Sequence, residues 1–189
     1  MIEVVPYQPR WREEFQTLGA ELCGALGDLA LRIDHIGSTS VPALAAKDII
    51  DIQVTVAALE PPIEAALSHV GYRRKTHITG DHIPPGASTD PTEWAKWLFN
   101  ELPGRRRVNL HVRVAGRPNQ RYPLLFRDYL RAHSPIAAAY AQTKLALARL
   151  HPDDVGAYYD VKDPVCDIIM GGAEEWATAT GWAPGSSDC

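Results

Sequence analysis

The spacing of apolar residues predicts a long helix near the start of the chain. Within residues 9–27, apolar side chains recur every three or four positions, as in a helix with one buried face; they are Trp11, Phe15, Leu18, Leu22 and Leu26. Pro9 is tolerated in the first turn of such a helix, and Gly27 is a residue type that commonly ends one. We therefore expect this helix to pack one face against the core.

Several later segments have the patterns of β-strands. Residues 48–57 (DIIDIQVTVA) are rich in Ile and Val, and residues 30–38 (ALRIDHIGS) form a shorter run that closes on Gly-Ser. Residues 106–116 (RRVNLHVRVAG) alternate between apolar and polar side chains, which is typical of a strand with one buried face. Residues 72–79 are expected to form a further strand, whereas residues 95–102 fit either a strand or a short helix.

Further helices are predicted between and after these strands. Residues 61–71 indicate a helix that ends at Gly71, and residues 41–47 (VPALAAK) have room for only a turn or two. Residues 80–94 are rich in Gly, Pro and Asp and are expected to form an irregular loop. The C-terminal part has three helical patterns, in residues 121–133, 135–150 and 161–181. This order predicts an α/β or α+β fold, a mixed β-sheet with flanking helices.

Length and composition indicate a globular protein with one core. Of the 189 residues, 46% are hydrophobic and 22% are charged, the balance of an ordinary folded domain. We expect one domain over residues 1–182 and a disordered tail over residues 183–189. Neither length nor composition indicates the oligomeric state.

Charge and cysteine content narrow the expected environment. The formal net charge of -4 gives no strong nucleic-acid signal, although residues 104–109 (GRRRVN) are locally basic. Three cysteines stand far apart without a C-x-x-C spacing. Their odd number and the lack of a signal-peptide pattern favour a reducing cytoplasm. No apolar run approaches the roughly 20 residues that a membrane helix needs.

The turn at Gly37-Ser38 and the acid at position 51 form the first candidate site. Glycine after a strand allows close approach of the backbone to an anion, so Ser38 and the following N–H groups can cradle a phosphate. Asp51 lies within an apolar strand, where a carboxylate needs a cleft, a partner or a metal. Lys47 and Asp48 precede this strand and can add a cation and a second acid. The alternative is structural: Ser38 caps the short helix and Asp51 accepts backbone hydrogen bonds.

The second candidate is the polar face of the strand over residues 106–116. Asn109, His111 and Arg113 alternate along it and share one side. If this strand neighbours the strand of Asp51, an imidazole and a carboxylate come together, a pair that suits a divalent metal. The alternative is a polar face that is simply exposed to water.

Weaker signals lie elsewhere in the chain. His77, Asp81 and His82 have the spacing of a metal site in a loop; the alternative interpretation is an ordinary solvated loop. Arg127 and Arg131 lie one helical turn apart, an arrangement that suits a phosphate or carboxylate as well as a surface with ion pairs. Lys162 can reach a phosphate or simply begin the last helix as a solvated residue.

Motifs along nearly the whole chain resemble the GrpB family. DHIGSTSVPALAAKDIIDIQV is similar to the family pattern His-[Ile/Val]-Gly-Ser-Thr-[Ser/Ala]-Val-Pro-Gly-Leu-Ala-Ala-Lys-Pro-Ile-Ile-Asp-Ile. PYQPRWREEF, NLHVRVAG, NQRYPLLFRDYLRAH, YAQTKLALA and YYDVK also match, in the same order. Some members of this family are fused to a dephospho-coenzyme A kinase domain, whereas this chain has no GxxxxGK[ST] motif.

The resemblance implies a nucleotidyltransferase-like fold, similar to the core of polymerase β. In that superfamily a Gly-Ser turn holds nucleotide phosphates, and three strand acids hold two divalent ions for in-line nucleotidyl transfer. Gly37 and Ser38 match the Gly-Ser turn, and Asp51 matches the first acid.

The sequence departs from the superfamily where the metals would bind. Gln53 occupies the position of the second acid, and the strand that would carry the third acid has none among its polar residues. One carboxylate is too few for two divalent ions. Within the family pattern, Ala43 replaces a usual Gly, where we expect a harmless helix former, and Asp48 replaces a usual Pro, facing away from Asp51.

The sequence thus predicts a protein that binds a nucleotide or another phosphate-bearing small molecule. The expected cleft is lined by Gly37, Ser38, Thr39, Lys47, Asp51, Asn109, His111 and Arg113. In a catalytic version, Asp51 and His111 hold Mg²⁺ or Mn²⁺ for nucleotidyl transfer, and Arg127 or Lys162 offsets developing charge. The main alternative is a non-catalytic module that binds a ligand or a protein. A third possibility is a metal-dependent hydrolase that uses His111 with His77 or His82.

Overall fold

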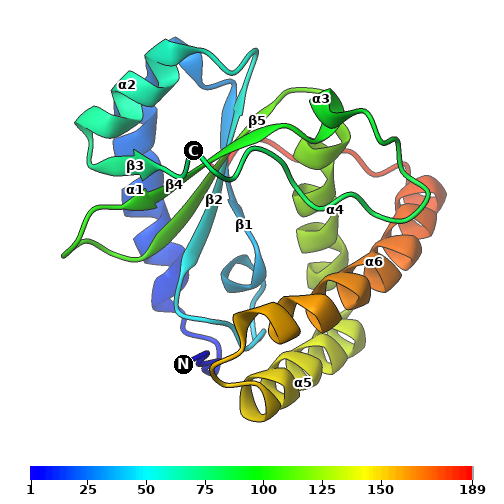
Figure 1. The fold of residues 1–189 in the computed structure, drawn as a ribbon. Helices are drawn as coiled ribbons and strands as arrows, with labels where there is room; N and C mark the ends of the chain where they lie inside the picture. Colours follow the sequence, from blue (N-terminus) through cyan, green and yellow to red (C-terminus); the bar gives the residue numbers. More distant parts are fainter. Residues whose placement is uncertain (189) are drawn as a thin grey trace.

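A computed structural model describes residues 1–188 of the chain, which form one mixed five-stranded sheet between two groups of helices (Figure 1). The strands are β1 (Arg32–Ile36), β2 (Ile50–Val56), β3 (Tyr72–Arg74), β4 (Lys96–Glu101) and β5 (Val108–Val114). Their order across the sheet is β1-β2-β5-β4-β3. The central pair β2 and β5 is parallel, and the other neighbouring pairs are antiparallel. The predicted mixed sheet with flanking helices is confirmed.

Helices cover both faces of the sheet (Figure 1). One face carries α1 (Arg10–Leu26) and α2 (Pro61–His69), and the other faces α4 (Pro118–Ala132), α5 (Ser134–Leu150) and α6 (Val155–Thr180). Short helices complete the described chain: the 3-10 turns η1 (Gly27–Leu29) and η2 (Ser38–Ser40), and α3 (Pro91–Trp94). No helix of residues 1–188 combines the length and apolar character that a membrane crossing requires.

The apolar face of the sheet forms the main core. Side chains alternate between the two faces of a strand, so Ile50, Ile52 and Val54 of β2 point to the same side as Val108 and Leu110 of β5. All five are fully buried among side chains from α1 and α2. Burial of this face fixes the register of the two central strands, because a shift by one residue would turn the apolar side chains outward.

The opposite face of the central strands is polar. Asp51 pairs in register with Asn109, and Gln53 pairs with His111. The helices on this side bury their apolar side chains in a second cluster, which α4, α5 and α6 form with Val41 and Leu44, and not against the polar face of the sheet. The polar side chains are therefore available to line a cavity.

The structure corrects two predicted elements and decides a third. Residues 41–47 contain no helix, and the short helix lies earlier, at Ser38–Ser40; Ala43 has φ of 64° there, which breaks any helical run. The last helix begins at Val155 rather than at residue 161, with the Asp154 side chain accepting a hydrogen bond from the Ala157 N–H, and it continues through Pro164. Residues 95–102, which fitted strand or helix, contain strand β4.

The C-terminal tail has partners on the edge strand β1. The Asp188 N–H donates to the Ile33 carbonyl at 3.2 Å, and the Asp188 carboxylate accepts from the His35 N–H at 3.0 Å. Ser187 Oγ lies 2.9 Å from both the N and the O of Ile33. Residues 187 and 188 of the segment expected to be a disordered tail, residues 183–189, thus contact the edge of β1 in this structure; Cys189 lies outside the described residues.

Candidate functional site

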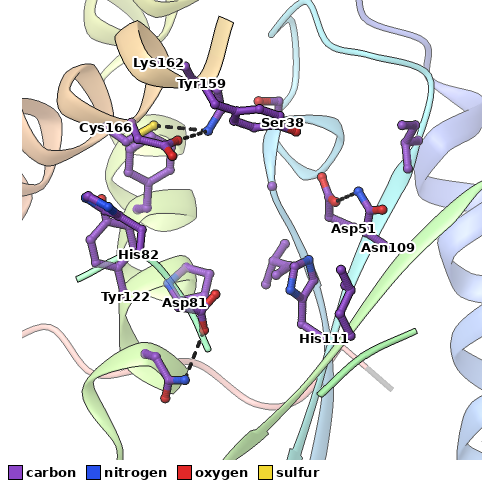
Figure 2. A pocket seen from close by; sticks show the side chains of 18 of the residues that line it. Ser38, Asp51, Asp81, His82, Asn109, His111, Tyr122, Tyr159, Lys162 and Cys166 are labelled. Atoms are coloured by element: carbon purple, nitrogen blue, oxygen red, sulfur yellow. Dashed lines mark hydrogen bonds and ion pairs between the residues drawn. The ribbon is translucent and has the colours of Figure 1, made fainter. Parts of the chain in front are cut away.

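A cavity of about 550 Å³ lies between the polar face of the sheet and the helices α4, α5 and α6 (Figure 2). It brings together all of the site residues that the sequence predicted except Arg127: Gly37, Ser38, Thr39, Lys47, Asp51, Asn109, His111, Arg113 and Lys162. Its volume lies within the range of small-molecule sites, roughly 300–1,000 Å³.

Arg127 lies outside this cavity and has a structural role. Its side chain is 4% exposed on α4, and it donates to the His35 carbonyl at 3.0 Å and to the carboxylates of Asp188 and Asp128 at 2.7 and 2.8 Å. The spacing of Arg127 and Arg131 correctly placed them on one helix face, but Arg131 also binds a backbone carbonyl, that of Ser40. Neither guanidinium lines the cavity.

Gly37 fits its place for two physical reasons. Its φ of 68° lies in the region that favours glycine, and a Cβ added there would stand 2.4 Å from Asp51 Oδ2. The turn that follows is closed by the Gly37 carbonyl, which accepts from the Ser40 N–H and from Ser40 Oγ. Glycine thus lets the backbone before Ser38 pass directly over the Asp51 carboxylate.

Asp51 is held in place by one neighbour on the next strand. The Asn109 side chain donates to Asp51 Oδ1 at 2.9 Å (Figure 2). Burial raises the pKa of Asp51, against the opposing effects of this hydrogen bond and of the charges of Lys47 and Lys162. Lys47 and Lys162 favour the charged form of Asp51, but burial outweighs them, so the carboxylate is protonated more readily than an ordinary aspartate.

Gln53 does not replace the missing second acid. Its side chain is fully buried on the polar face; its Nε2 donates to the Gln120 carbonyl at 2.9 Å, and its Oε1 accepts from Arg113 at 2.8 Å. Gln53 therefore joins β2 to α4 beneath the cavity. A carboxylate at this position would face the backbone carbonyl of Gln120, which repels negative charge.

His111 presents a hydrogen-bond donor to the cavity. Its Nδ1 lies 3.2 Å from an Arg113 nitrogen, and because arginine only donates hydrogen bonds, Nδ1 accepts. Burial, followed by the charges of Arg113 and Lys96, lowers the pKa of His111 well below 6.5. The ring is thus neutral at neutral pH with its proton on Nε2. Because Nδ1 accepts from Arg113 and Nε2 carries the proton, neither nitrogen offers a free lone pair to a metal ion.

Asp81 belongs to an ion-pair network and not to a metal site in the loop. Its carboxylate accepts from Arg113 at 2.8 and 2.9 Å, from Lys96 at 2.6 Å and from Asn119 at 3.0 Å. Although burial opposes it, the charges of Arg113 and Lys96 hold the pKa of Asp81 well below its usual range. Its predicted partner His82 instead lies 2.8 Å from Asp167.

Two observations therefore count against the metal-dependent hydrolase. His77, the other histidine of the predicted loop site, does not line the cavity. In residues 1–188 no three His, Cys, Asp or Glu side chains gather where they could hold a metal ion.

Lysines are concentrated at this cavity. The chain has five lysines, and four of them line it: Lys47, Lys96, Lys144 and Lys162. Lys47 Nζ donates to Tyr159 Oη at 2.9 Å, and Lys162 Nζ lies 3.2 Å from an Asp163 carboxylate oxygen. Lys162 Nζ also lies 3.6 Å from Cys166 Sγ (Figure 2). Although burial opposes it, the pKa of Lys162 is raised well above 10.5 by Tyr140, Cys166 and Asp163, so this ammonium stays charged.

Sequence reasoning assigned no role to Lys144. This lysine is 3% exposed, and its Nζ donates to Ser38 Oγ at 2.8 Å and to the Ala45 carbonyl. Burial, followed by the charge of Lys162, lowers the pKa of Lys144 to about 7. A signal was present in the sequence, because Lys144 interrupts the buried stripe of α5 formed by Ala137, Tyr140 and Leu147.

Aromatic side chains form the wall opposite the sheet. Tyr158 and Tyr159 of α6 lie beside Lys47, whose Nζ stands 5.3 and 4.9 Å from the two ring centroids. Tyr122 and Phe126 of α4 stack on each other with centroids 6.3 Å apart. The cavity therefore combines cations at the Ser38 end with flat apolar surfaces that suit a ring.

The residues present do not fit the divalent ions that the superfamily implies. Hard divalent cations need several oxygen ligands, most of them anionic, whereas Asp51 is the one cavity carboxylate without a cationic hydrogen-bond partner among the described residues. His111 offers an N–H, and Gln53 is buried under α4.

Comparison with known proteins shows the family and the fold. The family described as GrpB protein matches residues 1–171. The crystal structure of GrpB from Enterococcus faecalis superposes with a TM-score of 0.75 at 31% identity, over 92% of this chain and 99% of that one. Cid1, in complex with its short product ApU, superposes with a TM-score of 0.50 at 12% identity, over 77% of this chain and 43% of that one, a likeness of fold alone.

The curated relatives carry two kinds of name. A protein of Mycobacterium leprae named dephospho-CoA kinase is 39% identical over 95% of this chain, and the UPF0157 protein YqkA of Bacillus subtilis is 33% identical over 100% of it. These alignments cover 48% and 52% of the two relatives, so the chain spans about half the length of each. The family match and the structural likeness together show that the chain belongs to the GrpB family and has a nucleotidyltransferase-like fold.

Proposed function

We propose that the cavity binds a phosphate-bearing small molecule, and that a nucleotide is its ligand class. One observation carries this proposal: the cavity has an excess of positive charge. Five cations line it, and they face three carboxylates: Asp51, Asp81 and Asp163. Asp81 already pairs with Lys96 and Arg113, and Asp163 pairs with Lys162. An anionic ligand would balance the remaining charge.

The placement of the cations supports a phosphate group near Ser38. Lys144 already donates to Ser38 Oγ, so both groups are in position to bind one phosphate oxygen after a small shift. Lys47 and Lys162 lie beside the same ring, with Nζ to Tyr159 centroid distances of 4.9 and 5.5 Å. The tyrosines of α6 and the stacked pair on α4 offer surfaces on which a base can lie.

The named relatives agree with this ligand class. Five similar proteins from mycobacteria are named dephospho-CoA kinases, a name that contains a nucleotide-derived compound. The Cid1 structure holds the dinucleotide ApU. We therefore include dephospho-CoA among the compounds to test.

The second candidate is transfer of a nucleotidyl group, which adds catalysis to the same binding site. It depends on acids that this chain lacks, because Gln53 is buried beneath α4 and β5 contributes Asn109 and His111 instead of a third acid. Binding without transfer is therefore the function that the geometry supports best.

Isothermal titration of the chain with ATP, CTP, UTP and dephospho-CoA tests the proposal. We expect at least one of these compounds to bind with a micromolar Kd, and Lys144→Met to weaken its binding at least tenfold. Lys75→Met is the matched control, because Lys75 is the exposed lysine outside the cavity, and it is expected to bind like the wild type. Absence of binding for all four compounds would contradict the proposal.

A further inference from the structure

Three lysines from three separate elements gather around the Ser38 turn. Lys47 precedes β2, Lys144 lies on α5, and Lys162 lies on α6. Lys144 Nζ donates to Ser38 Oγ at 2.8 Å, and the Nζ atoms of Lys47 and Lys162 lie 4.9 and 5.5 Å from the centroid of one ring, that of Tyr159. In keeping with this proximity, the charges of Lys162 and Lys47 add to the effect of burial in lowering the pKa of Lys144. The three lysines therefore concentrate positive charge beside the Ser38 turn.

This charge stands where the superfamily would place its divalent ions. Asp51, which matches the first metal-binding acid, lies directly against the turn around which these lysines gather: a Cβ on Gly37 would stand 2.4 Å from Asp51 Oδ2, and the next residue, Ser38, accepts from Lys144 at 2.8 Å. A divalent cation on Asp51 would meet the same ammonium groups, and like charges repel strongly where water is excluded. The lysines therefore disfavour a metal at Asp51.

The same lysines can do for a ligand what a metal ion would do. Divalent ions in phosphate-binding sites neutralise the negative charge of the phosphate chain and fix its position. An ammonium group is a compact charge that binds phosphate without further ligands. Three of them around the hydroxyl of Ser38 supply both neutralisation and position.

We propose that this cavity binds its phosphate-bearing ligand as a metal-free polyanion, held by Lys47, Lys144 and Lys162 in place of divalent ions. This inference rests on the proposed function and adds the chemical form of the ligand. It concerns the free polyphosphate chain of a nucleoside triphosphate, which carries two more negative charges than the same chain with Mg²⁺ bound.

Titration calorimetry with and without metal separates this inference from the proposed function. ATP and inorganic tripolyphosphate are titrated into the chain at pH 7.0, once in EDTA and once with MgCl₂ in excess over the probe. We expect the Kd in EDTA to be equal to or lower than the Kd in Mg²⁺ for both probes. Tripolyphosphate is included because its binding depends on the phosphate chain alone.

The two proposals fail in different ways. Binding that is weaker in EDTA than in Mg²⁺ would overturn the metal-free form and leave the proposed function standing. Absence of binding for both probes in both buffers would overturn this inference, whereas the proposed function is overturned only if CTP, UTP and dephospho-CoA also fail to bind. Lys75→Met serves as the control and is expected to match the wild type in each buffer.

Asp51→Asn tests the inference without changing any lysine. Asp51→Asn preserves the shape of the side chain and an oxygen that can accept from Asn109, so the fold should be retained. Removing a negative charge beside the lysines is expected to tighten binding of tripolyphosphate in EDTA by two- to fivefold. A loss of binding in this variant in EDTA would contradict the inference, because it would show that the charge of Asp51 supports binding of the metal-free ligand instead of opposing it.

Discussion

Ala43 is the one non-glycine residue of the described chain with a positive φ, 64°. This conformation brings Cβ close to backbone oxygen and costs an L-residue roughly 1–2 kcal/mol. The family pattern has glycine at this position, and the expectation that Ala43 is a harmless helix former is wrong, because residues 41–47 do not form a helix.

Ala43→Gly is therefore expected to stabilise the protein. The relief of strain exceeds the added entropy of the unfolded chain by about 0.5–1 kcal/mol, which corresponds to a rise in Tm of roughly 1–4 °C. Urea and thermal unfolding followed by circular dichroism measure it. Ala139→Gly is the control with opposite sign, because Ala139 is exposed inside α5, where glycine lowers helix stability. A loss of stability in both variants would refute the account of Ala43.

The lowered pKa of Lys144 makes binding depend on pH. A phosphate favours the charged lysine, whose pKa is lowered to about 7 chiefly by burial. As pH rises above 7, binding must first protonate the amine, so affinity falls with rising pH. The titratable or charged groups that influence it from neighbouring elements are Lys47, Asp51, Lys162 and Cys166, with Tyr140 in contact on its own helix.

Calorimetric Kd values for tripolyphosphate between pH 7 and 9 test this expectation. For the wild type, affinity should fall by up to tenfold per pH unit, the limit for uptake of one proton. Lys144→Arg keeps its charge throughout this range and should flatten the profile. A profile of the same slope in both proteins would assign the pH dependence to another group.

At the scale of elements, the Asp81 network ties the segment between β3 and β4 to the sheet. Asp81 joins Lys96 of β4 and Arg113 of β5, whose side chains are 11% and 6% exposed. Removing the carboxylate leaves both cations without their partner in a site of little water. The loop that borders the cavity should then lose its anchor.

Asp81→Asn is expected to lower the free energy of unfolding at pH 7 by roughly 2–4 kcal/mol. Because the folded state holds the pKa of Asp81 low, its contribution is present above the ordinary carboxylate pKa of about 4 and is lost as pH falls below it. Urea unfolding at pH 7 and at pH 3 checks both parts: the variant should differ from the wild type less at pH 3. Asp90→Asn is a suitable control, since Asn caps a helix as well as Asp does; an equal loss there would argue against the network.

Strand periodicity explains how much of the site the sequence could predict. Alternation along β2 and β5 placed Asp51, Asn109 and His111 on one face, because the side-chain period of a strand is a local property. The parallel pairing of these strands then brought them together, as the hypothesis of neighbouring strands required. The turn at Gly37 was likewise marked by the residue types it needs.

The residues that the helices contribute to the cavity could not be predicted from spacing in the same way. Spacing gives the faces of a helix, but which face meets the cavity depends on tertiary packing. Arg127 therefore looked like a cavity residue although it faces β1 and the tail, and Lys144 was hidden in the apolar stripe of α5. The tautomer of His111 also depends on a contact, with Arg113, that no spacing rule contains.

At the scale of the whole molecule, the net charge is -4, whereas cations outnumber carboxylates in the cavity. The charge on which the proposed ligand class depends is local, so overall composition gave no strong nucleic-acid signal and did not indicate the site. The fold is shared with GrpB of Enterococcus faecalis and with Cid1, but a shared fold does not imply shared chemistry. In this chain the polar face of the sheet carries amides, an imidazole and lysine neighbours where metal-dependent transfer needs acids.

The most direct measurement is a crystal structure of the chain soaked with ATP in EDTA. We expect phosphate oxygens within about 3 Å of Ser38 Oγ and Lys144 Nζ, at hydrogen-bond distance, with Lys47 or Lys162 in contact with the same phosphate chain. ATP bound elsewhere on the molecule, or bound in the cavity with its phosphates away from Ser38 and Lys144, would contradict it.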